Sequence, residues 1–222
     1  MEVQKGVRRE MSEKILKLMM TALVLVLAAL PALAESDARA PRVHDYNFLD
    51  VAYLYQEIDI ENRHETAHGF GVSGGIQLYD WLSLWASSSA AMMETEYVNV
   101  TTAIIGIGIG AHTPVSDTVS VYANLGYLTA EVEAEWAVDR DVSASVTTDG
   151  SGYSLGTGMR ALVLPRLELS VGVSLVSIED GSDSSFGGGL EYSLTDKVAL
   201  GAVVSVADDV VGAAFGTRFY FK

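Results

Sequence analysis

Five ionisable residues in this chain stand among small and apolar neighbours: Asp50, Arg160, Glu168, Glu191 and Arg218. A charged side chain in such surroundings is tolerated when an opposite charge pairs with it. Two arginines and three carboxylates can supply that pairing for one another. We therefore predict that the five residues form one Arg/carboxylate network, although they are far apart in the sequence.

The histidines and the remaining acidic residues do not form a recognisable catalytic set. His64 and His68 have the His-x-x-x-His spacing, which places two rings on one face only in a helix, and this segment lacks helical periodicity. The vicinal pair Asp208 and Asp209 has no histidine nearby, and no Gly-x-Ser-x-Gly nucleophile motif occurs. We therefore predict no catalytic residue, no metal site, no cofactor and no enzymatic activity.

Acidic residues dominate residues 130–151, which we interpret as the longest loop between two strands. Glu131, Glu133 and Glu135 alternate within this segment and offer oxygen ligands to Ca²⁺ or Mg²⁺. Simple solvation is the alternative that we favour, because no set of ligands recurs at a fixed spacing. The formal net charge of −15 argues against a nucleic-acid partner, whose phosphates require a basic surface.

A two-residue period runs through the elements that must position these side chains. In residues 211–221, Val211, Phe215 and Phe219 alternate with Gly212, Gly216 and Arg218, so one face is apolar and the other small or polar. A closed barrel with hydrocarbon outside and a wet interior requires this pattern. A soluble β-sandwich or lipocalin-like barrel is the alternative fold, but a Gly/Ser-rich face would pack a poor core.

The same alternation predicts ten strands, at 46–58, 69–79, 82–92, 101–112, 119–129, 152–164, 167–178, 186–194, 198–206 and 210–221. An even number is expected of an antiparallel up-and-down transmembrane β-barrel, and eight or twelve strands remain alternatives. Residues 59–68 and 179–185 are assigned to loops. The chain contains no cysteine, so no disulfide can stabilise the fold.

The N-terminal residues have the features of an export signal. Basic residues precede an apolar run from Leu18 to Leu30, and Ala32-Leu33-Ala34 supplies a small-residue cleavage site. We predict a cleaved signal peptide at 1–34, a periplasmic lead-in at 35–45 and a barrel domain at 46–222. Removal of the five basic and three acidic residues in the signal peptide changes the net charge from −15 to −17.

In the predicted strands, the five residues of the charge network face the lumen in the third of the barrel nearest the periplasm. Such a network can be a selectivity ring or a structural plug. We favour the plug, because a ten-stranded barrel is close to the size of about eight strands at which side chains fill the interior.

Several short segments give the chain a family resemblance: Tyr53-Leu54-Tyr55, the turns at 112–117 and 192–196, and Phe219-Tyr220-Phe221. With these and the signal peptide, it resembles the small outer-membrane β-barrel proteins of Gram-negative bacteria. The resemblance implies a location in the bacterial outer membrane, contact with lipid and lipopolysaccharide, and insertion by the barrel-assembly machinery guided by the last strand.

We expect a monomer with a structural or interaction role, a narrow, plugged lumen and acidic external loops. A small-solute porin is the second hypothesis, which the glycines on the inner face permit and the charge network opposes. An outer-membrane enzyme is a third hypothesis with less support.

Overall fold

The computed structural model describes residues 46–60, 63–95, 98–139, 142–179 and 181–221. The predicted signal peptide (1–34) and lead-in (35–45) lie outside the described residues. Among the described residues, no helix is long and apolar enough to cross a membrane.

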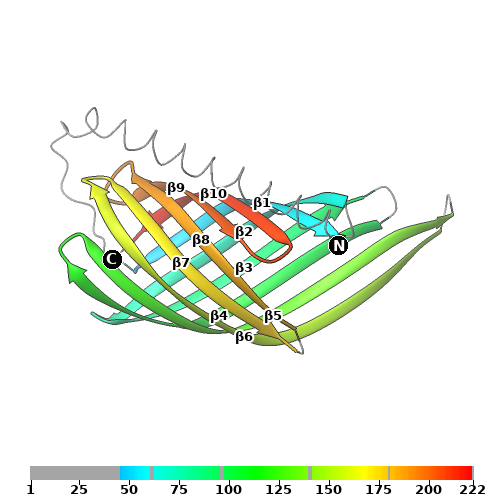
Figure 1. Cartoon of the computed structure of the whole chain (residues 1–222), viewed down its shortest axis with the longest axis horizontal. Helices are drawn as coiled ribbons and strands as arrows, with labels where there is room; N and C mark the ends of the chain where they lie inside the picture. Colours follow the sequence, from blue (N-terminus) through cyan, green and yellow to red (C-terminus); the bar gives the residue numbers. More distant parts are fainter. Residues whose placement is uncertain (1–45, 61–62, 96–97, 140–141, 180, 222) are drawn as a thin grey trace, which may run out of the picture. The chain divides into compact units, whose positions relative to one another are not determined.

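Ten antiparallel strands form a closed barrel in which each strand pairs with its neighbours in sequence and β1 pairs with β10 (Figure 1). The strands are β1 (Phe48–Ile60), β2 (Arg63–Tyr79), β3 (Leu82–Glu94), β4 (Val98–Ser116), β5 (Val119–Asp139), β6 (Val142–Leu164), β7 (Leu167–Ile178), β8 (Gly181–Ser193), β9 (Val198–Val206) and β10 (Val210–Tyr220). The predicted fold class and the count of ten are confirmed, and the alternatives of eight and twelve are wrong.

We call the end of the barrel where β1 begins and β10 ends the terminal end, and the opposite end the far end. The β2–β3, β4–β5, β6–β7 and β8–β9 turns lie at the terminal end. The other five hairpin connections lie at the far end.

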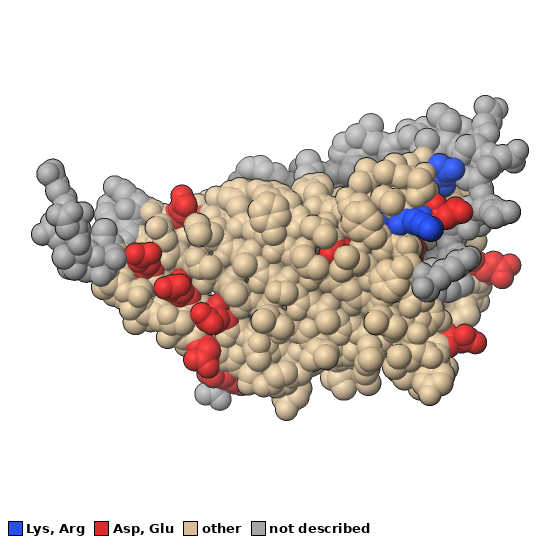
Figure 2. Space-filling view, turned by 180° about the vertical axis from the view of Figure 1, so that it is seen from behind, with Lys and Arg blue, Asp and Glu red and all other residues tan. Residues whose placement is uncertain are grey.

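A band of apolar side chains faces outward around the barrel. On β4, Ile105 and Ile107 are 60% and 62% exposed, whereas Gly106 between them is buried. Aromatic side chains flank this band, with Tyr127 against Tyr153 toward the far end and Tyr79 stacked on Trp81 at the terminal end. Figure 2 shows the band as a broad surface almost free of charge, with acidic residues gathered beyond one end of it. This arrangement is the one that a lipid environment requires of a barrel.

Several strands are longer at the far end than the sequence predicted. Residues 63–68 belong to β2, residues 130–139 and 142–151 belong to β5 and β6, and β8 begins at Gly181. The predicted loops at 59–68, 130–151 and 179–185 are therefore wrong. Their polar residues do not end the strands, because a strand that has left the hydrocarbon can have water on both faces while its backbone hydrogen bonds continue.

The β5–β6 hairpin extends furthest of these (Figure 1). It is paired up to Asp139 and Val142. On β5, Glu131, Glu133 and Glu135 point to the same outer side as Tyr127 and are exposed. Ionised carboxylates on the outer face cannot lie in hydrocarbon. The membrane-spanning part of β5 therefore ends before Glu131.

Candidate functional site

Barrel closure brings the five predicted network residues to the inner wall near the terminal end. Asp50 lies near the start of β1 and Arg218 near the end of β10, and the two are direct cross-strand partners although 168 residues separate them. Arg160 lies near the end of β6. Glu168, near the start of β7, is directly opposite Glu191 of β8. Alternation within each strand directs all five side chains inward.

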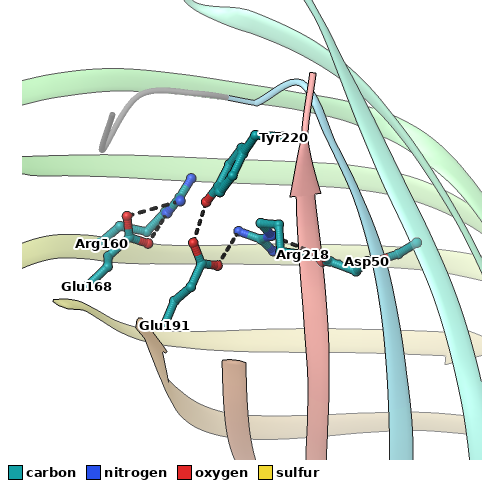
Figure 3. A network of polar contacts seen from close by, with 7 residues as sticks. Asp50, Arg160, Glu168, Glu191, Arg218 and Tyr220 are labelled. Atoms are coloured by element: carbon teal, nitrogen blue, oxygen red, sulfur yellow. Dashed lines mark hydrogen bonds and ion pairs between the residues drawn. The ribbon is translucent and has the colours of Figure 1, made fainter. Parts of the chain in front are cut away.

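Arg218 is the centre of one group of contacts (Figure 3). Its Nε and NH2 donate to the two carboxylate oxygens of Asp50 at 2.7 and 2.8 Å, and its NH1 lies 2.9 Å from Oε2 of Glu191. The hydroxyl of Tyr220 donates to the other oxygen of Glu191. The guanidinium also lies 4.2 Å from the centre of the Phe48 ring. Paired, two-point contact of this kind is the strong form of an ion pair.

Arg160 and Glu168 form the second group, also on the inner wall (Figure 3). Nε and NH2 of Arg160 donate to the two oxygens of Glu168 at 2.5 and 3.1 Å. The two side chains are only 8% and 11% exposed. The structure therefore brings all five residues together as two hydrogen-bonded groups side by side, linked by the register that sets Glu168 against Glu191.

Aromatic residues that the sequence analysis did not identify complete this layer. The ring of Tyr46, just before β1, stacks on His112 of β4 with 3.7 Å between centroids. The guanidinium of Arg160 lies 5.2 Å from the centre of the same Tyr46 ring. In the strand order, β1 and β6 are on opposite sides of the barrel, so the contact of Tyr46 with Arg160 crosses the lumen.

A cavity of about 600 Å³ occupies the lumen next to this layer. Trp85 of β3, Tyr122 of β5, Arg160 and Arg218 are among its lining residues. The indole of Trp85 rests on glycines of the inner wall, since a Cβ atom at Gly126 would lie 2.4 Å from Cζ2 of Trp85. The room left by these inner-face glycines is thus partly filled by an aromatic side chain.

The other candidates from the sequence lie outside the lumen or at the far end. On the outer face of the β1–β2 hairpin, His64 contacts the carboxylate of Asp59, and Nδ1 of His68 is 2.5 Å from the hydroxyl of Tyr53. Asp208 and Asp209 lie between β9 and β10.

Glu131, Glu133 and Glu135 line the outer face of β5. In the part of the chain that the structure describes, no three His, Cys, Asp or Glu side chains are placed to hold a metal ion.

Comparisons with known proteins place this barrel in a family. The model of the outer membrane protein beta-barrel domain matches residues 20–193. The comparison with curated proteins found no match.

Three solved structures illustrate what this barrel is similar to. The translocator domain of the autotransporter NalP from Neisseria meningitidis is 9% identical, with a TM-score of 0.49 and coverage of 92% of this chain and 98% of that one. The attachment invasion locus protein Ail of Yersinia pestis is 11% identical, with a TM-score of 0.45 and coverage of 80% and 99%. The KdgM porin is 11% identical, with a TM-score of 0.42 and coverage of 78% and 99%. At these identities, the three proteins do not indicate what this chain binds.

The closed ten-stranded barrel, its outward apolar band and the family match over more than half of the chain lead to one conclusion: this protein belongs to the outer membrane protein beta-barrel domain family and resides in the bacterial outer membrane.

Proposed function

We propose that the protein is a structural or interaction protein of the outer membrane whose lumen is closed at the terminal end. The observation that carries this proposal is the contact of Tyr46 with Arg160, which joins opposite sides of the barrel across the lumen. The ion pairs of Arg160 and Arg218 lie in the same layer. Together these side chains obstruct the path of a solute along the barrel axis.

The energetics of the charged layer favour a plug over a mobile gate. Each arginine is held at two points by a carboxylate, and none of the five side chains is more than 24% exposed. To open the layer, an ion pair would have to separate in an environment where unpaired charge is costly. A ten-stranded barrel is also narrow enough for side chains to fill much of its cross-section.

The proposal includes an orientation and a set of partners. The terminal end faces the periplasm. The far end faces outward and carries the acidic outer part of the β5–β6 hairpin, residues 130–139 and 142–151, which we call the β5–β6 extension. Lipid and lipopolysaccharide surround the apolar band of a monomer that the barrel-assembly machinery inserts. The role is non-catalytic, since the two arginines and three carboxylates of the lumen layer are paired with one another.

A small-solute channel is the second candidate, and the cavity of about 600 Å³ favours it. A continuous path would require the Tyr46 and Arg160 contact to open. Conductance through a single barrel distinguishes the two functions.

Planar-bilayer recording tests the plug. We expect little conductance from the wild type and a steady increase in the double variant Arg160→Ala/Glu168→Ala, which removes both charges together and leaves neither unpaired. Lys197→Ala removes an exposed positive charge at the β8–β9 turn and serves as the control. A large, steady wild-type conductance equal to that of the double variant would refute the proposal.

A further inference from the structure

Within the described residues, one stretch of β6 has a strand on one side only. Residues 142–151 pair with β5, but the ladder to β7 begins at Gly152. Beyond it, the amide of Glu179 donates to the carbonyl of Ser151, which is the last backbone hydrogen bond toward β7. Among the described residues, no strand pairs with this side of β6 from Val142 to Asp149. We call residues 145–149 the open edge.

The direction of the backbone groups along the open edge follows from that last contact. The carbonyl of Ser151 points toward the β7 side. Backbone groups alternate sides along a strand, so the N–H and C=O groups of Ser145, Thr147 and Asp149 also point to that side. They form a row of donors and acceptors with the spacing that another strand matches.

The inner face of the same extension is apolar, which reverses the pattern of the membrane-spanning part. Cross-strand pairing sets Met93 of β3, Val100 of β4, Ala134 of β5 and Val146 of β6 in one row. Met93 is 9% exposed, but Val146, at the end of the row, is 55% exposed. A further strand beside β6 would continue this row and cover Val146.

The outer face next to the open edge is acidic. Glu131, Glu133 and Glu135 of β5 stand directly opposite Asp149, Thr147 and Ser145 of β6. Each of these three cross-strand pairs therefore has a carboxylate on β5, one strand away from the edge, and Asp149 adds a carboxylate on the edge strand itself. A neighbouring strand with basic residues on this face would be attracted, and one with acidic residues repelled.

The open edge also lacks two features that often protect an exposed strand, proline and lysine. Residues 145–149 contain no proline and no lysine, and three of the five are Val or Thr. Two copies of this chain in one membrane have their β6 strands running in the same direction, so antiparallel pairing of two open edges is excluded. Parallel pairing of two copies would bring their acidic outer faces side by side, which like charges oppose, so a different protein is the occupant that the charge of this face favours.

We propose that the open edge of β6 is a docking site for an extended segment of another protein in which apolar residues alternate with basic ones. The segment adds one strand to the sheet, its apolar side chains cover Val146, and its basic side chains face the carboxylates of the outer face. This inference specifies the interaction role proposed above and rests on the far end facing outward. It does not depend on a closed lumen, so the conductance test and the test below fail independently.

The test uses the folded barrel in detergent micelles and two labelled heptapeptides. One, Ala-Lys-Val-Lys-Ala-Lys-Trp, copies the apolar positions of residues 130–136 and has lysine at the other positions. The other keeps the native glutamates. Binding is followed by fluorescence anisotropy. We expect the lysine peptide to bind the wild type and the glutamate peptide to bind at least about tenfold more weakly, because like charges meet on the outer face.

The variant Thr147→Pro removes the backbone N–H of residue 147, which points to the open side and is not used in pairing with β5. Proline is compatible with an edge strand at such a position. We expect it to bind the lysine peptide about tenfold more weakly, whereas Thr147→Ala, which keeps the donor, binds like the wild type. Circular dichroism confirms that both variants retain their strands.

Amide exchange provides a second measurement. The Thr147 amide should exchange rapidly in the free barrel and slow down at least tenfold when the lysine peptide is bound. Any of four results would overturn the proposal: no binding to the wild type, equal binding to Thr147→Pro, preference for the glutamate peptide, or self-association of the wild type that Thr147→Pro abolishes.

Discussion

At the scale of single residues, Arg218 has the most contacts in the charged layer, with Asp50, Glu191 and the Phe48 ring. Its replacement by alanine would leave two carboxylates with uncompensated charge in a confined part of the lumen. Removing one partner of such a pair costs about 3–5 kcal/mol, and the partial exposure of these groups places the expected loss at the lower end.

Urea titration of the folded barrel in detergent measures this loss in the free energy of unfolding. Arg218→Lys keeps the charge but not the two-point geometry, so we expect it to fall between the wild type and Arg218→Ala. Lys197→Ala controls for the removal of a positive charge elsewhere. If Arg218→Ala and Lys197→Ala unfolded at the same urea concentration, the ion pairs would contribute nothing to stability.

The glycines of the inner wall differ in the space around them, and this difference allows a matched comparison. A Cβ atom at Gly126 would lie 2.4 Å from the Trp85 ring, whereas at Gly201 its nearest neighbour would be the Leu190 carbonyl oxygen at 3.7 Å. We expect Gly126→Ala to displace the indole and Gly201→Ala to leave it in place. In a background with Trp81→Phe and Trp136→Phe, Trp85 is the only fluorophore of its kind, and its emission maximum should shift in the first variant alone. An identical spectrum for both variants would contradict this packing.

The residues of the site differ in how far the sequence could predict them. The inward direction of Asp50 and Arg218 follows from counting along strands of known period, and opposite charges make their contact expected. Tyr46 and His112 were missed because a contact across a lumen depends on barrel diameter and on which rings meet, and neither property is periodic. Both residues lie in predicted strands, Tyr46 at the start of 46–58 and His112 at the end of 101–112, so alternation indicated their side of the wall but not which ring each would meet.

At the scale of elements, apolar alternation predicted where strands cross hydrocarbon but not where they end. Strand 101–112 was recognised because Ile105, Ile107 and Ile109 contrast with glycines. The outer parts of β2, β5 and β6 were assigned to loops because their residues are polar. Backbone pairing continues there regardless of side-chain polarity, so the missing information was pairing, which a single sequence does not contain.

The position of the β5–β6 extension can be measured by labelling, because the chain has no native cysteine. With the far end outward, Glu133→Cys in intact cells should react with a membrane-impermeant maleimide. Leu125→Cys on the lipid-facing band and Asp196→Cys at the terminal end should not. Disruption of the outer membrane should make Asp196→Cys reactive, which shows that the site is accessible in itself. Reaction of Asp196→Cys and protection of Glu133→Cys in intact cells would reverse the proposed orientation.

At the scale of the whole molecule, the polarity of the inner and outer faces of the barrel is reversed between the membrane band and the far end. Within the band, apolar side chains such as Ile107 face outward and glycines and serines face inward, whereas on the β5–β6 extension carboxylates face outward and Val132 and Val146 face inward. The surroundings of the outer face change from lipid to water between the two parts, so carboxylates replace apolar side chains on that face.

A charge scan across this boundary tests the reversal by its depth dependence. An arginine on the lipid face of a barrel costs about 2–4 kcal/mol near the bilayer midplane and about 0–1 near the interface. We therefore expect Ile107→Arg to lower the free energy of unfolding in lipid vesicles by the first amount. Glu133→Arg, on the same outer side of the barrel but beyond the band, should change it little. In buffer that contains neither lipid nor detergent, neither variant should fold, because the apolar band would then face water. Equal costs for the two substitutions would mean that both positions meet the same solvent, and the assignment of the band to hydrocarbon and of the extension to water would then be wrong.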